Sequence, residues 1–133
     1  GKGCQLRDGT DVTVIATGMM VQEAVKASDT LKSEGVSVRV IDMHTIKPLD
    51  EEIVLKAARE TGAIVTSEEA TVLGGLGSAV CECVAAGCPV PVVRHGVQDE
   101  FGRSGAAKEV LAAYGLTAEG IIRSVRHVLT LKK

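Results

Sequence analysis

Val12-Thr-Val-Ile-Ala16 and Val36-Ser-Val-Arg-Val-Ile41 are two short β-branched runs, and the residues between them repeat with helical spacing. Such runs predict buried strands. The inner face of the intervening helix would carry Val21, Ala24, Val25, Ser28 and Leu31, and Gly35 suits the C′ position at which a helix ends. A strand, a helix and a second strand in direct succession predict a parallel βαβ unit.

The same alternation continues toward the C-terminus. Asp50 is a suitable N-cap for a helix that Gly62 ends, and a strand follows at residues 63–66. A glycine-rich loop at residues 74–77 then leads into a helix, whose inner face would carry Ala79, Val80, Cys83 and Val84. The repeat predicts an α/β fold with a mostly parallel sheet.

The last predicted strand covers residues 90–93. Pro91 predicts that it lies at a sheet edge, because proline donates no ladder hydrogen bond. Two helices follow, one over residues 106–114 and one from the cap Thr117. The second would bury Ile121, Ile122, Val125, Val128 and Leu129.

A short segment ahead of this repeat also alternates like a strand. It reads Cys4-Gln-Leu-Arg7 and is followed by the turn residues Asp8-Gly9. Considered locally, this pattern predicts a hairpin with the strand at residues 12–16.

Composition restricts the functions that need to be considered. A length of 133 residues with no linker or repeat predicts one domain, residues 1–133. The net charge of −2, without a basic stripe, argues against nucleic-acid binding. No apolar run reaches the roughly 20 residues of a membrane helix. Residues 1–10 do not resemble a signal peptide, so we expect no membrane contact and a cytoplasmic location.

Three of the four cysteines, Cys81, Cys83 and Cys88, are close in sequence and suggest a metal site. On a helix, however, Cys81 and Cys83 would point about 200° apart, and no His or fourth Cys lies nearby. We therefore expect no metal ligands or disulfides, with Cys83 as a small core residue and the other cysteines partly exposed.

Two loops could carry chemistry. The backbone N–H groups of Gly74-Gly-Leu-Gly77 could hold a phosphate, although a tight turn with close helix–sheet packing explains Gly75 and Gly77 better. Ser67-Glu68-Glu69 is expected just after a strand, at the edge where open α/β sheets bind ligands. Because neighbouring carboxylates diverge, loop capping or a partner contact is favoured over acid–base catalysis.

Two histidines, His44 and His95, are also expected to follow strands at this edge, whereas His127 is expected on the outer part of the last helix. No Gly-x-Ser-x-Gly elbow marks a nucleophile. A surface or interface role is therefore favoured for His44 and His95.

Five motifs occur in order at consistent spacing: Asp11–Gly18, Ile41–Asp50, Gly62–Glu69, Gly74–Val80 and Asp99–Gly105. Together they resemble the C-terminal domain of transketolases, particularly of those made as two separate subunits. Related domains occur in deoxyxylulose-phosphate synthases and in the β subunits of 2-oxoacid dehydrogenases, but Met43–Pro48 and Phe101–Gly105 look more like transketolase. Ala70 departs from the family pattern, in which His often follows the glutamate pair.

The resemblance implies a three-layer α/β/α domain with a five-stranded mixed sheet of order 1-3-2-4-5, in which strand 1 is antiparallel. Strand 1 would then pair with the strand at residues 36–41, which conflicts with the local hairpin interpretation. We favour the family arrangement.

The resemblance also implies a structural and assembly role in an enzyme that transfers two-carbon ketol units between sugar phosphates. Such an enzyme holds thiamine diphosphate and Mg²⁺ on a Gly-Asp-Gly motif ending in Asn residues. This chain contains neither that motif nor any Asn, so no catalytic, cofactor-binding or metal-binding residue is expected in it. Expected partners are the remaining domains or an N-terminal subunit, in a homodimer of the full enzyme.

Two alternatives remain open. One is the C-terminal domain of a deoxyxylulose-phosphate synthase. The other is a regulatory module that binds a small molecule in a crevice lined by Thr17, Gly18, His44, Glu68 and His95.

Phe101 and Arg103 lie in a polar, glycine-flanked loop. We expect Phe101 to anchor an interface with the rest of the enzyme and Arg103 to belong to its polar rim. Packing of Phe101 on the domain's own core is the competing explanation.

Overall fold

The computed structural model describes residues 2–71, 75–97 and 117–132. Within these ranges the strands are β1 (Cys4–Arg7), β2 (Val12–Ala16), β3 (Val38–Asp42), β4 (Ile64–Thr71) and β5 (Val92–Val97). The helices are α1 (Met20–Lys32), α2 (Glu51–Thr61), α3 (Leu76–Gly87) and α5 (Ala118–Leu131). The helix predicted over residues 106–114 lies outside the described residues. No helix in the described ranges is long and apolar enough to cross a membrane.

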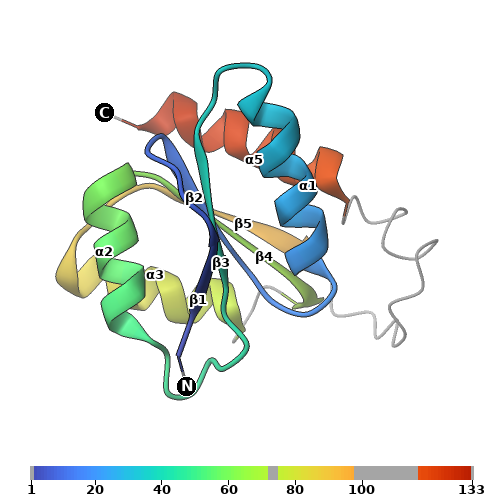
Figure 1. The fold of residues 1–133 in the computed structure, drawn as a ribbon. Coiled ribbons are helices and arrows are strands. Elements are labelled where there is room, and N and C mark those ends of the chain that lie inside the picture. Colours follow the sequence, from blue (N-terminus) through green and yellow to red (C-terminus); the bar gives the residue numbers. More distant parts are fainter. Residues whose placement is uncertain (1, 72–74, 98–116, 133) are drawn as a thin grey trace.

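The strands form one sheet of order β1-β3-β2-β4-β5, in which β1 is antiparallel and the other four strands are parallel (Figure 1). This confirms the predicted order. The hairpin interpretation is wrong, because β1 pairs with β3, with Cys4 opposite Asp42. Both edges of β2 are occupied by β3 and β4, so no edge remains for β1.

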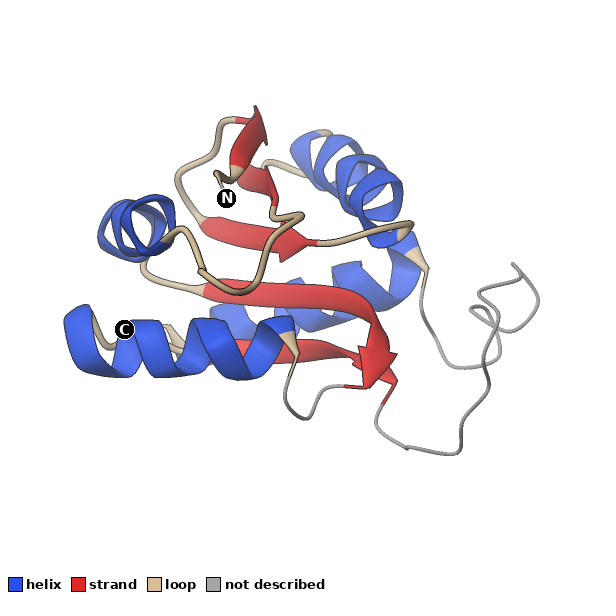
Figure 2. Cartoon of the chain, turned by 90° about the horizontal axis from the view of Figure 1, so that it is seen from below, coloured by secondary structure: helices blue, strands red, loops and turns tan. Residues whose placement is uncertain are grey.

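Helices cover both faces of the sheet, which confirms the three-layer architecture (Figures 1 and 2). Successive residues of the central strand β2 serve different layers: Val14 packs in the core beneath α1 and α5, and Ile15 in the core beneath α2 and α3. This period-two alternation is the usual geometry of a strand. It explains why β2 is buried along its whole length.

Glycines end two of the helices as the sequence indicated. Gly35 has φ +84°, and its N–H donates to the carbonyl of Lys32 at 3.1 Å, while the N–H of Val36 donates to the carbonyl of Leu31 at 2.9 Å. These two bonds form a Schellman motif with Gly35 at C′. Gly62 ends α2 in the left-handed conformation, at φ +73°.

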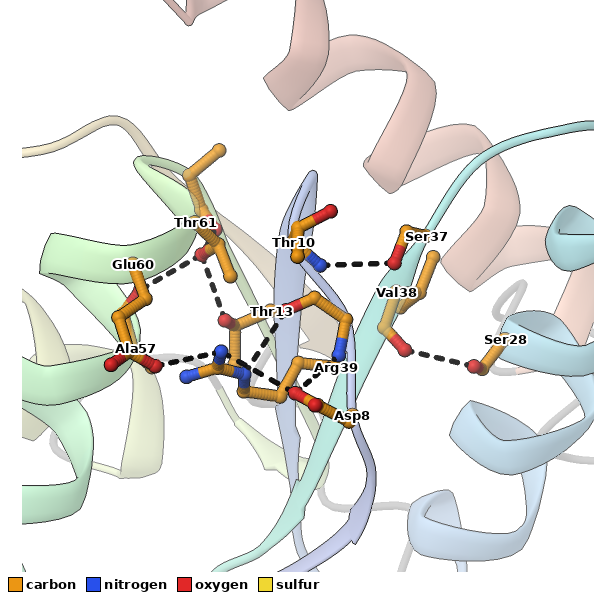
Figure 3. A network of polar contacts seen from close by, with 12 residues as sticks. Asp8, Thr10, Thr13, Ser28, Ser37, Val38, Arg39, Ala57, Glu60 and Thr61 are labelled. Carbon is orange, nitrogen blue, oxygen red and sulfur yellow. Dashed lines mark hydrogen bonds and ion pairs between the residues drawn. The ribbon is translucent and has the colours of Figure 1, made fainter.

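The amino ends of the strands are joined by buried polar contacts (Figure 3). Arg39 on β3 donates from Nε to the carbonyl of Gly9 at 3.2 Å and pairs through an Nη atom with Glu60 at 2.8 Å. Thr13 and Thr61 share a hydrogen bond of 2.8 Å between their hydroxyls. A Cβ on Gly9 would collide with the backbone of β3, so this position requires glycine. The network ties α2 and the β1–β2 turn to the sheet.

The cysteines have the environments that the sequence indicated. Cys83 is buried, Cys4 is exposed, Cys81 and Cys88 are intermediate, and all four are free thiols. Among the described residues, no group of three or more His, Cys, Asp or Glu side chains is placed to hold a metal ion.

Asp50 fixes the start of α2 and the segment that precedes β1. Its Oδ1 accepts a hydrogen bond from the N–H of Ile53 at 3.3 Å, which confirms the predicted N-cap, and its Oδ2 accepts one from the N–H of Gly3 at 2.9 Å. The bond from Gly3, with that from Ile53, lowers the pKa of Asp50 below its usual value despite the opposing effect of burial. The ionised form is therefore stabilised in the folded state.

Replacing Asp50 with Ala is expected to lower the free energy of unfolding by about 0.5–2 kcal/mol at neutral pH. The folded-state pKa lies below the unfolded value, so the Asp50 contribution is fully present above the unfolded pKa and is lost as pH falls through the folded pKa. The free energies of unfolding of wild type and Asp50→Ala, measured by urea denaturation, should therefore converge in strong acid.

Glu52→Ala is the matched control, because Glu52 is exposed in the same first helical turn. Its loss should cost less than about 1 kcal/mol. Equal destabilisation by the two variants, or a difference independent of pH, would contradict the assigned role of Asp50.

Candidate functional site

The carboxyl edge of the sheet gathers most of the predicted site residues, and helices begin there. In a parallel sheet each strand leads into a helix whose first N–H groups lack partners within that helix. The N-caps of α1 and α3 are Met19 and Gly75, and neither provides a side-chain hydrogen bond. Both helix starts therefore need a hydrogen-bond acceptor from elsewhere in the chain.

Glu68 supplies the acceptor for α3. Its two carboxylate oxygens accept hydrogen bonds from the N–H groups of Leu76 at 3.0 Å and Gly77 at 2.9 Å. The side chain is only 3% exposed. A buried carboxylate at a helix N-terminus is stabilised both by these bonds and by the helix dipole. The N–H groups that a phosphate would need are thus already used, which favours a packing role for the glycine-rich loop.

Glu69 supplies the hydrogen-bond acceptor at the start of α1, on the other face of the sheet. Its Oε1 accepts a hydrogen bond from the N–H of Met19 at 3.4 Å and lies against Gly18, which has φ +58°. Adjacent strand residues point to opposite faces, so the two carboxylates diverge as expected. They lie within β4, however, and not after it as predicted. Pairing with β5 is regular as far as Ser67, loses its register there and resumes at Thr71, which extends the strand past its apolar part.

Glu23, which the sequence analysis did not single out, caps α5. It lies in the first turn of α1, and its Oε1 accepts a hydrogen bond from the N–H of Ala118 at 3.0 Å. The predicted cap Thr117 accepts from the N–H of Gly120 at 3.3 Å. Residues 23 and 118 are far apart in sequence, so no local pattern could have revealed the pair.

The two edge histidines do not form one site. His95 lies inside β5 and not after it, because β5 begins at Val92, after Pro91, and continues to Val97. His95 Nδ1 is 2.9 Å from the hydroxyl of Ser67, which is fully buried. His44 follows β3 as predicted and is exposed, with Nδ1 3.8 Å from an oxygen of Asp42. Three strand spacings, roughly 14 Å, separate β3 from β5.

The crevice predicted around Thr17, Gly18, His44, Glu68 and His95 is therefore divided by the sheet. Glu68 faces α3, whereas Gly18 contacts Glu69 on the other face. The backbone N–H of Thr17 donates to the carbonyl of Ser67 at 3.1 Å. Phe101 and Arg103 lie outside the described residues.

Close contacts account for Gly75 and Gly77. Gly75 has φ −103°, which any residue can adopt, but a Cβ there would collide with the carboxylate of Glu68. A Cβ on Gly77 would lie 2.7 Å from Cδ of Arg94 and 3.1 Å from the hydroxyl of Thr66. Of the two reasons predicted for these glycines, positive-φ backbone angles apply to neither Gly75 nor Gly77, and close packing applies to both.

A groove of about 730 Å³ lies between α2, α3 and the loop that precedes α2. Its lining includes Ile46, Leu55, Ala79 and Cys83, with Glu51 and Glu82 also present. Burial is the main cause that raises the pKa of the Cys83 thiol, and the negative charge of Glu51 raises it further. This cysteine is therefore a poor nucleophile at neutral pH. None of the predicted site residues lines the groove.

A double-mutant cycle tests the contact between Gly75 and Glu68. Gly75→Ala is expected to lower the free energy of unfolding by roughly 1–3 kcal/mol, because the new Cβ displaces a buried carboxylate from its two N–H donors. In a Glu68→Ala background the same change should cost much less. Urea denaturation of the four proteins measures the coupling, and additive effects would show that the glycine serves another purpose.

Comparison with known proteins identifies the family. The family model described as "Transketolase, C-terminal domain" matches residues 1–121. The 6-deoxy-6-sulfo-D-fructose transketolase subunit SqwH of Clostridium sp. (strain MSTE9) is 48% identical over 132 residues, which is 99% of this chain and 41% of that protein. The putative transketolase C-terminal section of Methanocaldococcus jannaschii is 46% identical over 126 residues, which is 94% of this chain and 39% of that protein.

A 1-deoxy-D-xylulose-5-phosphate synthase of Syntrophotalea carbinolica is 47% identical over 130 residues, covering 97% of this chain and 20% of that protein. A solved structure described as a split gene transketolase, inactive beta4 tetramer, superimposes with a TM-score of 0.94 at 46% identity, covering 99% of this chain and 43% of that one. The chain thus spans about two fifths of the transketolase relatives it matches. It belongs to the transketolase C-terminal domain family.

Proposed function

We propose that this chain is a structural and assembly domain of a thiamine-diphosphate-dependent transketolase, which transfers two-carbon ketol units between sugar phosphates. On this proposal residues 1–133 form one domain, and the cofactor and its Mg²⁺ are held by other parts of the enzyme. Its similarity to a transketolase subunit and to a transketolase C-terminal section supports the parent activity.

The observation that carries the non-catalytic role is the capping of helix starts by the domain's own carboxylates. Glu69, Glu68 and Glu23 occupy the starts of α1, α3 and α5. Asp50 caps the remaining described helix, α2. A diphosphate bound at these helix starts would need their N–H groups, which already donate to carboxylates, and those carboxylates would repel its negative charge. The described residues therefore do not fit thiamine diphosphate.

One other enzyme is a specific candidate for the parent protein. The similarity to a 1-deoxy-D-xylulose-5-phosphate synthase is nearly as high as that to the transketolase subunits, so a synthase of this kind is the second candidate. The structural role of this domain would be the same in either enzyme. The sequence of the remaining domains of the enzyme distinguishes the two candidates.

Partners of the domain follow from the same proposal. They are the remaining domains, or an N-terminal subunit, within a cytoplasmic homodimer of the full enzyme, without nucleic-acid or membrane contact. The split-gene relative is described as a tetramer, which is consistent with assembly through subunits of this type. Phe101 and Arg103 remain the proposed interface residues.

Calorimetric titration of the folded 133-residue chain with thiamine diphosphate and Mg²⁺ is expected to give no binding heat, and the chain alone should transfer no ketol group. Circular dichroism confirms that the titrated sample is folded. Binding in the micromolar range would contradict the proposal. Combined with the remaining domains of the enzyme, or with its N-terminal subunit, the same chain should take part in both binding and turnover.

A further inference from the structure

We infer that the groove between α2, α3 and the loop that precedes α2 is a binding site for a small amphipathic cation, an organic ammonium ion that carries an apolar chain. Three features of the groove point to this ligand class: its size, its apolar lining, and two carboxylates that have no ion-pair partner. Such a ligand would bind whichever enzyme the domain serves.

The groove has the size of a small-molecule site. Its volume of about 730 Å³ lies within the roughly 300–1,000 Å³ that is usual for ligand pockets. The helices α2 and α3 lie side by side on one face of the sheet (Figure 1). A Cβ on Gly87, the last residue of α3, would lie only 2.7 Å from Cδ2 of Leu55 on α2. The two helices therefore meet at the end of α3 and bound the groove on that side.

The lining of the groove is largely apolar and continuous with the core. Ile46, Leu49 and Leu55 line it and are partly buried side chains packed against the core beneath α2 and α3. On the opposite wall, the short side chains of Ala79 and Ala86 leave room for a ligand between the helices. Each methylene group that a ligand buries here should raise its affinity by up to roughly fourfold.

The surroundings of the groove favour a small ligand over a protein partner. In the described part of the chain, the large hydrophobic residues that are exposed are Leu6, Met19 and Leu131, and none of them lines the groove. A protein interface normally has an extended apolar centre. Here the apolar surface is confined to the groove itself, which suits an alkyl chain.

Two carboxylates determine which charge the groove prefers. Glu51 in the first turn of α2 and Glu82 on α3 both line the groove, and neither forms an ion pair within the described part of the chain. Together with Lys47 they give the lining a net charge of −1. The charge of Glu51 also raises the pKa of the Cys83 thiol, so its field extends into the groove. An ammonium group would be attracted here, and an anion would be repelled.

The experiment titrates the 133-residue chain with hexylammonium chloride and follows the amide resonances of Leu55 and Ala79 by NMR. Both resonances should shift in a saturable manner, because both residues line the groove. From butylammonium to hexylammonium the affinity should rise by up to roughly fourfold for each added methylene group. Sodium hexanoate, which has the same chain length and the opposite charge, should give no saturable shift.

Four single substitutions test the charges of the groove. Glu51→Gln and Glu82→Gln should each weaken hexylammonium binding by about 1.5- to 5-fold, because each removes one exposed opposite charge. Lys47→Gln should strengthen binding, because it removes a like charge. Glu52→Gln is the matched control, since Glu52 is exposed in the same first turn of α2 but does not line the groove, and it should change the affinity little.

The apolar space is tested by Ala79→Leu, which should fill the groove and abolish the shift of the Leu55 amide. Circular dichroism verifies the fold of each variant, and if Glu51→Gln does not fold, Glu82→Gln decides. Equal responses to hexylammonium and hexanoate, unmoved amides, an affinity independent of chain length, or equal effects of the groove and control variants overturn the inference. The response should persist when the chain is combined with the remaining domains of the enzyme. Its loss there would show that another part of the enzyme covers the groove, which also overturns the inference.

Discussion

A parallel sheet sends the beginnings of its crossover helices to one edge, where unpaired N–H groups and the positive ends of the helix dipoles accumulate. The rest of this structure depends on how that edge is neutralised. Each of the four described helices meets a carboxylate there: Glu69 at α1, Asp50 at α2, Glu68 at α3 and Glu23 at α5. Only Asp50 belongs to the helix start that it caps.

Glu69 and Glu23 link elements that are distant in the chain, whereas Glu68 links the consecutive elements β4 and α3. Glu68 and Glu69 are neighbours on β4 but accept hydrogen bonds from helix starts on opposite faces of the sheet. Glu23 then connects α1 to α5. Open α/β sheets often bind anionic ligands at this edge. Here the starts of the four described helices are filled from within by carboxylates of the chain itself.

Local signals in the sequence predicted most of the fold. The cap at Asp50, the helix end at Gly35 and the apolar strand at Val12–Ala16 each depend on residues within a few positions. The predictions that were wrong concern positions where distant pairing decides. β4 continues through Glu68 and Glu69, where its register with β5 is irregular, because Thr71 pairs with Val97 beyond them, although the apolar pattern has already ended.

The same limit applies to the candidate site. The divergence of Glu68 and Glu69 could be predicted from the period of a strand, and the close packing of Gly75 and Gly77 from their place at a helix start. The family resemblance corrected the placement of β1, which local turn chemistry had assigned to a hairpin. The partner of Glu23 and the separation of His44 from His95 required the three-dimensional arrangement.

The unequal environments of the cysteines give the domain an internal reporter. Cys83 lies at the contact between α2 and α3 and is buried, whereas Cys4 is exposed. Burial also keeps the Cys83 thiol protonated at neutral pH, and alkylating reagents attack the thiolate. The rate at which Cys83 becomes alkylated, relative to Cys4, therefore measures how accessible its thiol is from the groove between α2 and α3. No label or added residue is needed for that measurement.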